Sequence, residues 1–272
     1  HEIGHVLGFF HTMCRYDRDS YIKLVTQNIN KHAIGNFQKI SHNCSDVYGM
    51  GYDYGSIMHY DERCDSINGR PTIIAADANY QKTMGSDLIS FSDIFVINEH
   101  YGCNAICNKS TSAKCANEGF PHPRNCSICI CPSGYGGLLC DKRPLGCGED
   151  LVATNKKQIV NRRLGFGSGL RDHFDFCNYM ISVRSSKSVL LLKKSYFSIQ
   201  APNGKKIVVE LEWVSYGYDR PGCIRGGVEI KSQKDQKLTG YRFCSQLGSG
   251  GPIVSSSNPL PLILFNRQDT MQ

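Results

Sequence analysis

Residues 1–19 read HEIGHVLGFFHTMCRYDRD, and the spacing of histidines in this stretch decides how the first part of the chain folds. His1 and His5 are four residues apart, so on a helix both imidazoles lie on one face and can converge on one ion. Gly8 accepts backbone angles that end a helix, and the resulting turn brings His11 back as a third ligand. Three neutral nitrogen ligands leave a tetrahedral zinc ion with one open position, so the stretch predicts a catalytic zinc site.

Glu2 lies beside these ligands without being one of them, within reach of a metal-bound water as a general base. Zinc lowers the pKa of that water to about 7 and polarises a carbonyl, which favours hydrolysis near neutral pH. Histidines that merely decorate an amphipathic helix would explain HExxH alone, whereas HExxHxxGxxH favours zinc. Residues 56–60, SIMHY, add a second element, in which we expect Met58 to pack beneath the imidazoles.

The composition of the 272 residues indicates globular, extracellular material in two or three domains. The net charge of +7 is scattered in short basic pairs, which indicates solvated surface and no nucleic-acid partner. Fourteen cysteines favour an oxidising compartment outside the cell. The longest aliphatic run, residues 189–192, is too short for a membrane span.

Composition changes twice along the chain and predicts three domains. Residues 1–105 carry the histidine motif, whereas residues 106–142 hold six cysteines and are too short to build a core without cross-links. Residues 147–272 alternate apolar and polar positions between turn residues, as in residues 207–213, which predicts strands. The expected fold class is multidomain, α+β followed by all-β.

HEIGHVLGFFHTMCRYDRD and GSIMHY together resemble the astacin family of zinc endopeptidases, which are metzincins with nematode and hatching-enzyme members. For residues 1–105 the resemblance implies the C-terminal portion of a metzincin catalytic domain with one zinc ion. It also implies a role for Tyr60, as a phenol that contacts zinc and then donates a hydrogen bond to the oxyanion. The implied zinc ligands are His1, His5 and His11, with Glu2 as general base and acid and Met58 as the structural residue beneath the metal.

Two departures from the family pattern stand out. Thr12 occupies the place of the family's glutamate that receives the new amino terminus on maturation. The family's twisted sheet before the active-site helix is missing, so we expect an N-terminally truncated piece of a longer protein. Arg63 and Arg70 follow the methionine turn, either to favour an acidic substrate residue or as ordinary surface residues.

Residues 106–142 resemble an EGF-like module, whose tail CxCxxGYxGxxC matches CICPSGYGGLLC. Residues 147–272 resemble a CUB domain, a two-sheet β-sandwich, on the CG that opens this segment, on APNG at 201–204 and on GGVEIK and TGYRFCS within 226–245. The EGF-like resemblance implies the disulfides Cys107–Cys126, Cys115–Cys129 and Cys131–Cys140. The CUB resemblance implies Cys147–Cys177 and Cys223–Cys244. Cys44 and Cys64 flank the methionine turn and can pair, which leaves Cys14 and Cys103 unassigned.

Residues 182–199, SVRSSKSVLLLKKSYFSI, interrupt the CUB-like pattern. Without them, residue 181 would run directly into the AlaPro turn as the expected strand. We interpret the stretch as extra sequence, either a loop insertion or translated non-coding sequence. As a loop it should lie outside the sandwich and be poorly ordered.

These patterns predict a secreted zinc-dependent endopeptidase. The alternative is a catalytically inert fragment, or an adhesion protein that binds through its EGF-like and CUB modules. Expected partners are protein or peptide substrates, such as extracellular-matrix, cuticle or egg-envelope proteins, and proteins that contact the CUB domain. Glycosylation is predicted at three sequons, at Asn43, Asn108 and Asn125.

Overall fold

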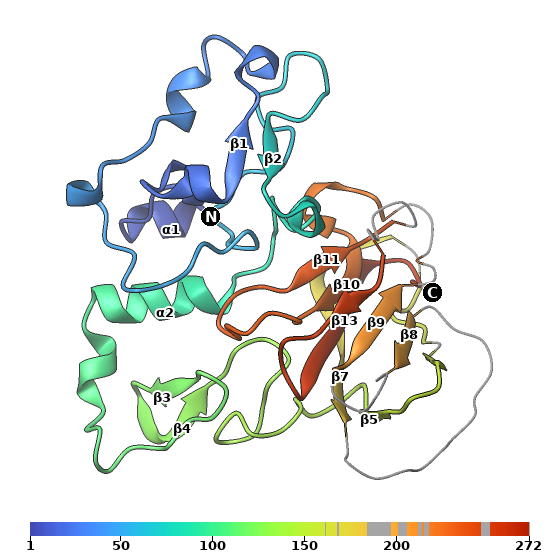
Figure 1. The fold of residues 1–272 in the computed structure, drawn as a ribbon. Coiled ribbons are helices and arrows are strands. Elements are labelled where there is room, and N and C mark those ends of the chain that lie inside the picture. Colours follow the sequence, from blue (N-terminus) through green and yellow to red (C-terminus); the bar gives the residue numbers. More distant parts are fainter. Residues whose placement is uncertain are drawn as a thin grey trace.

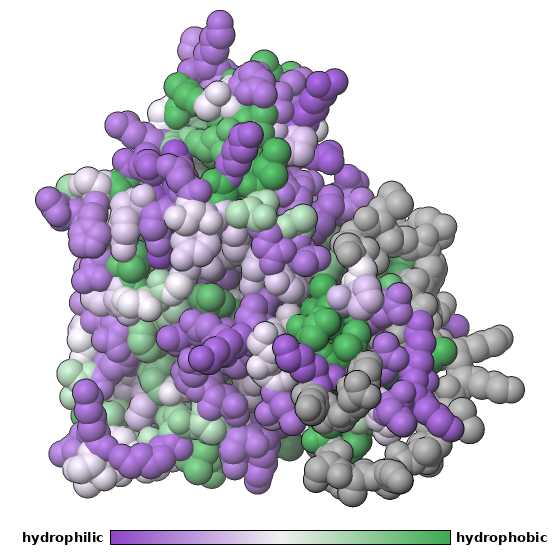
Figure 2. All heavy atoms as spheres, viewed as in Figure 1, coloured by the Kyte–Doolittle hydropathy of each residue, from purple (hydrophilic) through white to green (hydrophobic). Residues whose placement is uncertain are grey.

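The computed structural model describes residues 1–160, 162–167, 169–183, 197–200, 206–211, 214, 218–245 and 251–271. Figure 1 shows the histidine-bearing part at the top, helix α2 (Phe91–His100) beneath it, a small hairpin below the helix, and the C-terminal sheets to one side. Among these residues no helix combines the length and the apolar character needed to cross a membrane. Figure 2 shows polar residues spread over this face with small apolar patches between them.

The first part is built mainly from turns around a compact core. Its regular elements are helix α1 (Glu2–Val6) and the antiparallel strands β1 (Ile22–Leu24) and β2 (Ile73–Ala75). Single 3-10 turns connect them at Thr12–Cys14, Arg18–Ser20, Thr26–Asn28, Ile34–Phe37, His42–Cys44 and Ala78–Tyr80. Met13, Phe37, Ile73 and Met84 are no more than 2% exposed, so the core is drawn from residues far apart in sequence.

A small cross-linked hairpin follows helix α2. Strands β3 (Phe120–His122) and β4 (Asn125–Ile130) pair antiparallel, and Phe120 packs against two aromatic rings of α2. So few apolar residues are buried here that the covalent links must hold the segment together. They are Cys107–Cys126, Cys115–Cys129 and Cys131–Cys140.

Two sheets packed face to face form the C-terminal sandwich. The five-stranded sheet has the order β11 (Tyr241–Phe243), β10 (Gly226–Ile230), β13 (Leu260–Gln268), β7 (Leu170–Val183) and β5 (Asp150–Ala153). The four-stranded sheet has the order β12 (Ile253–Val254), β9 (Val208–Leu211), β8 (Phe197–Gln200) and β6 (Gln158–Val160). Tyr179, Val209 and Leu262 fill the shared core, and disulfides join Cys147 to Cys177 and Cys223 to Cys244.

The stretch expected to lie wholly outside the sandwich instead enters it at both ends. Residues 182–183 complete β7, and residues 197–199 belong to β8, which pairs with both β6 and β9. Ile199 is only 1% exposed in the core. The prediction was wrong at these ends because Phe197–Gln200 is an inner strand of its sheet; residues 184–196 lie outside the described residues.

The expected Cys44–Cys64 bond is also absent. Both cysteines are free thiols in the described chain, as are Cys14 and Cys103. Cys44 is exposed on a 3-10 turn, whereas Cys64 is half-buried. Proximity to the methionine turn in sequence therefore did not predict proximity in space.

We expect Leu262→Ala, in the middle of β13, to lower the free energy of unfolding of the sandwich by about 2–5 kcal/mol. Leu262 is 0% exposed, so its truncation leaves a cavity between the sheets. Urea unfolding followed by intrinsic fluorescence measures the change. Val254→Ala is the control, because Val254 is 51% exposed. Equal losses from both variants would contradict the assigned core.

Candidate zinc site

Three imidazoles converge at the start of the chain. The Nε2 atom of His1 lies 3.2 Å from that of His5 and 3.2 Å from that of His11, and the Nε2 atoms of His5 and His11 are 3.1 Å apart. Two nitrogens bound tetrahedrally to one zinc ion are about 3.3 Å apart, given a bond of about 2.05 Å. The three side chains therefore fit zinc, and they are the one group of metal-ligating side chains found among the described residues.

Backbone carbonyls hold two of these rings through their other nitrogen. Nδ1 of His1 donates to the carbonyl of Ile57 at 2.7 Å, and Nδ1 of His5 donates to that of Phe9 at 2.9 Å. Donation from Nδ1 leaves the lone pair of Nε2 free for a metal ion. Burial, followed by repulsion from His5, lowers the pKa of His11, which keeps the third ring neutral as well.

The turn after the short helix carries the third ligand into place. Gly8 has a φ of +92°, a conformation that side chains other than glycine rarely adopt. Thr12 then donates its backbone N–H to the carbonyl of Met58 at 3.0 Å, which joins the segment after His11 to the methionine turn. The glycine turn predicted from the sequence is therefore present, and it is fixed from below.

Met58 lies directly beneath the helix. It is 1% exposed, and a Cβ added to Gly4 would lie 2.6 Å from its sulfur. Glycine at this position therefore lets the thioether approach the helix backbone between the first two ligands. The structure brings Met58 to the underside of the histidine cluster.

Buried Asp93, on helix α2, anchors the methionine turn. Its carboxylate accepts hydrogen bonds from Ser56 Oγ at 2.6 Å and from the Ile57 backbone N–H at 3.1 Å. It also completes a capping box with Ser90 at the start of α2. Because Ile57 in turn holds His1, the orientation of the first ligand depends on a residue 92 positions away in the sequence.

Tyr60 and His59 lie on either side of the turn's end. The ring of Tyr60 stacks at a tilt on His11, with centroids 4.4 Å apart, and burial raises the pKa of its phenol. His59 is fully buried; it donates from Nδ1 to the Tyr60 carbonyl and accepts from the Tyr52 hydroxyl at 2.8 Å. Burial lowers the pKa of His59 to about 4, so this ring is a neutral link in the backbone and not a ligand.

The remaining predicted residues are more dispersed. Glu2 is exposed in the first turn of α1, and its carboxylate is close enough to raise the pKa of His11 in opposition to the effect of burial. Arg63 and Arg70 are exposed, and Arg63 forms an ion pair with Glu62 at 3.5 Å. The structure therefore gathers the zinc ligands, Glu2 and Tyr60 at one place and leaves both arginines at the surface.

Sequence reasoning missed the buried residues that hold these groups in place: Tyr52, Asp53, His59 and Asp93. The Ser-x-x-Asp pattern at residues 90–93 was a detectable signal for a helix start, though it does not reveal the contact with the methionine turn.

Three histidines on HExxHxxGxxH with a methionine beneath them define a metzincin-type zinc site. Residues 1–102 match the model of the peptidase family described as Astacin, and this part of the chain therefore belongs to the astacin family. The match ends just after helix α2, so it covers the whole site.

Relatives extend the similarity to the rest of the chain. Zinc metalloproteinase nas-31 of Caenorhabditis elegans is 46% identical over 98% of this chain and 41% of its own length. Nas-23 of the same worm is 38% identical over 97% of this chain and 46% of its length, so the chain spans less than half of either relative. The solved structure of high choriolytic enzyme 1, a hatching enzyme zinc-protease from Oryzias latipes, is 37% identical over 37% of this chain and 50% of that chain, with a TM-score of 0.35.

We expect the protein to bind one zinc ion per chain, and to lose it as the pH falls below about 6.5, because protons compete for imidazole nitrogens. The lowered pKa of His11 keeps that ring unprotonated to a lower pH than an ordinary histidine, so it should not be the first ligand to fail. Zinc content after dialysis between pH 5 and pH 8 measures the loss.

The matched control for this experiment is a pair of histidine variants. His5→Ala should abolish stoichiometric zinc binding, whereas His32→Ala, at an exposed residue outside the cluster, should leave it intact. Stoichiometric zinc in His5→Ala would contradict the site.

Proposed function

We propose that the chain carries the catalytic centre of a secreted zinc-dependent endopeptidase. The observation that supports this most directly is the convergence of three Nε2 atoms at 3.1 to 3.2 Å with Glu2 and Tyr60 beside them. A structural zinc site would close the coordination sphere with a fourth protein ligand, whereas this group has three. The relatives named as zinc metalloproteinases point to the same activity.

Zinc, when bound, supplies an activated water and a Lewis acid for the scissile carbonyl. Glu2 accepts the proton from the attacking water and passes it to the leaving amine, which its exposed place beside the ligands permits. Tyr60 remains protonated at neutral pH because burial raises its pKa, so its hydroxyl donates a hydrogen bond to the developing oxyanion. Met58 holds the helix from below and takes no part in proton transfer.

The other parts of the chain fit accessory modules of an extracellular enzyme. An EGF-like identity for residues 106–142 is supported by the hairpin and its three disulfides, and a CUB identity for residues 147–272 by the two packed sheets and their two disulfides. Five disulfides support secretion, because such bonds persist in oxidising compartments. The catalytic segment then corresponds to residues 1–105.

Glycosylation and protein substrates complete the proposal. Asn43, Asn108 and Asn125 are all exposed, as acceptor asparagines must be. The substrates are proteins or peptides met outside the cell, among which matrix, cuticle or egg-envelope proteins fit a secreted endopeptidase.

Glu2→Gln should lower kcat/KM for casein by about 10²–10⁴-fold while zinc content stays at one per chain, because the amide cannot accept the proton. Glu99→Gln is the control, since Glu99 lies at the far end of helix α2 and contacts Asn104. Cleavage by Glu2→Gln at the unaltered rate would favour the alternative, in which the zinc part is inert and the protein acts by binding.

Tyr60→Phe should lower kcat by about 10²–10³-fold with little change in KM, because the lost hydroxyl acts on the transition state and not on the bound substrate. Steady-state kinetics on a fluorogenic peptide separates the two constants. Tyr16→Phe, a half-buried tyrosine whose ring contacts His42, is the matched control. A rise in KM alone would contradict the oxyanion role.

A further inference from the structure

The C-terminal sandwich touches the segment that leads into the methionine turn. The carboxylate of Asp53 accepts two hydrogen bonds from Thr239, from the backbone N–H at 3.2 Å and from Oγ1 at 3.1 Å. It also accepts from the Gly55 backbone N–H at 2.9 Å and from Ser92 Oγ at 2.6 Å. One buried carboxylate therefore joins the sandwich, helix α2 and the turn that carries Met58.

The approach of the two backbones is close. A Cβ added to Gly55 would lie 2.4 Å from the Thr239 side chain, and one added to Gly222 would lie 1.9 Å from the carbonyl oxygen of Gly85. Thr239 is 4% exposed and Asp53 is 3% exposed. Water is excluded from this junction, so the polar groups there depend on each other for hydrogen bonds.

A chain of aromatic rings runs from the sandwich toward the zinc ligands. Tyr241, on β11, packs against Tyr80 with centroids 4.5 Å apart, and Tyr80 stacks on Tyr54 at 4.2 Å. Tyr54 in turn contacts Tyr52, whose hydroxyl donates to His59. The hydroxyl of Tyr241 is fixed by Asp77 at 2.6 Å.

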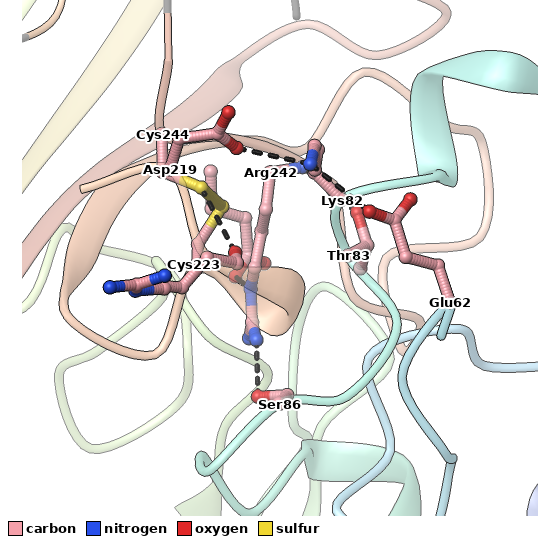
Figure 3. The surroundings of a disulfide bond; sticks show 10 residues. Glu62, Lys82, Thr83, Ser86, Asp219, Cys223, Arg242 and Cys244 are labelled. Carbon is pink, nitrogen blue, oxygen red and sulfur yellow. Dashed lines mark hydrogen bonds and ion pairs between the residues drawn. A yellow bond between two sulfur atoms is a disulfide. The ribbon is translucent and has the colours of Figure 1, made fainter. Parts of the chain in front are cut away.

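A second set of charged contacts anchors the same edge of the sandwich. Figure 3 shows Lys82 between Glu62 and Asp219, at 3.1 and 3.0 Å, next to the Cys223–Cys244 disulfide. Arg242 reaches Ser86, and its backbone N–H donates to Thr83 Oγ1 at 3.0 Å.

The guanidinium of Arg242 also forms an ion pair with Glu229 at 2.9 Å, with both side chains under 5% exposed. A buried pair of this kind becomes costly when either partner loses its neighbours. The edge is therefore committed to its contact with the zinc-binding part.

We propose that the sandwich is a fixed support of the zinc site, and that Asp53, Thr239 and Tyr241 are positioning residues for the methionine turn. Thr239 supplies two of the hydrogen bonds to the carboxylate that orders residues 53–56, and Tyr241 ends the ring contacts that reach His59. The proposal rests on the proposed function only for its effect on catalysis. Its effect on the order of the turn and on zinc retention does not require peptidase activity.

The test uses the zinc-loaded protein with Thr239→Val and Tyr241→Phe. Each variant keeps the side-chain volume and removes one hydroxyl. Amide hydrogen exchange over residues 53–60 should speed up by about three- to tenfold, and zinc should dissociate faster by a similar factor, because each variant removes one hydrogen bond from the support. Thr239→Ser, which retains the hydroxyl, should restore both rates.

Matched controls lie elsewhere in the sandwich. Thr154→Val removes a hydroxyl that bonds near β5, and Tyr218→Phe removes one that donates to Gln268. Both should leave exchange at residues 53–60 and zinc dissociation unchanged. Unchanged rates in Thr239→Val and Tyr241→Phe, or equal changes in the controls, would overturn the proposal.

Two further outcomes separate this proposal from the proposed function. If Thr239→Val unfolds the sandwich and the turn then exchanges freely, support is demonstrated, whereas a turn that stays protected beside an unfolded sandwich excludes it. Faster exchange and zinc loss in a protein that cleaves no substrate would uphold the support and reject the peptidase.

Discussion

Three imidazole nitrogens lie within 3.2 Å of one another, and the local structure around them exists to keep them there. Lone pairs at that separation repel unless the rings are neutral and a cation lies between them. Carbonyl oxygens from Ile57 and Phe9 therefore orient the rings, and a glycine with positive φ returns the third. Helix α1 spans only five residues, too few to be stable without these contacts.

The second layer consists of two buried carboxylates on either side of the methionine turn. Asp93 accepts from Ser56 and Ile57, and Asp53 accepts from Gly55 and from Thr239. A buried carboxylate is tolerated only where several donors replace its water. Each therefore enforces one backbone path, and together they determine where Met58 and Tyr60 lie.

Local patterns made the ligand set predictable. The spacing of His1, His5 and His11 is a direct consequence of helical periodicity and one glycine turn, so it needs no knowledge of distant contacts. The same holds for the alternation at residues 207–211, where Ile207, Val209 and Leu211 are the buried positions. The five disulfides present are the pairs that the module resemblances implied.

Long-range contacts set the limit of that prediction. Nothing in the neighbourhood of Asp53 in the sequence indicates that its partner is 186 residues away, and β8 was interpreted as an insertion because its strand partners β6 and β9 are not adjacent to it in the chain. Cys44 and Cys64 showed the opposite error. Their nearness along the chain suggested a bond, although one is exposed and the other half-buried.

The glycines at the junction have a consequence for how such proteins diversify. A module that hangs on a linker can be exchanged for another without altering its neighbour, but Gly55 and Gly222 face backbone or side-chain atoms at distances that no side chain could occupy. A foreign sandwich would need a threonine and a glycine at matching places on its surface. The two parts are therefore inherited as a pair, and recombination between them is penalised even when each part folds.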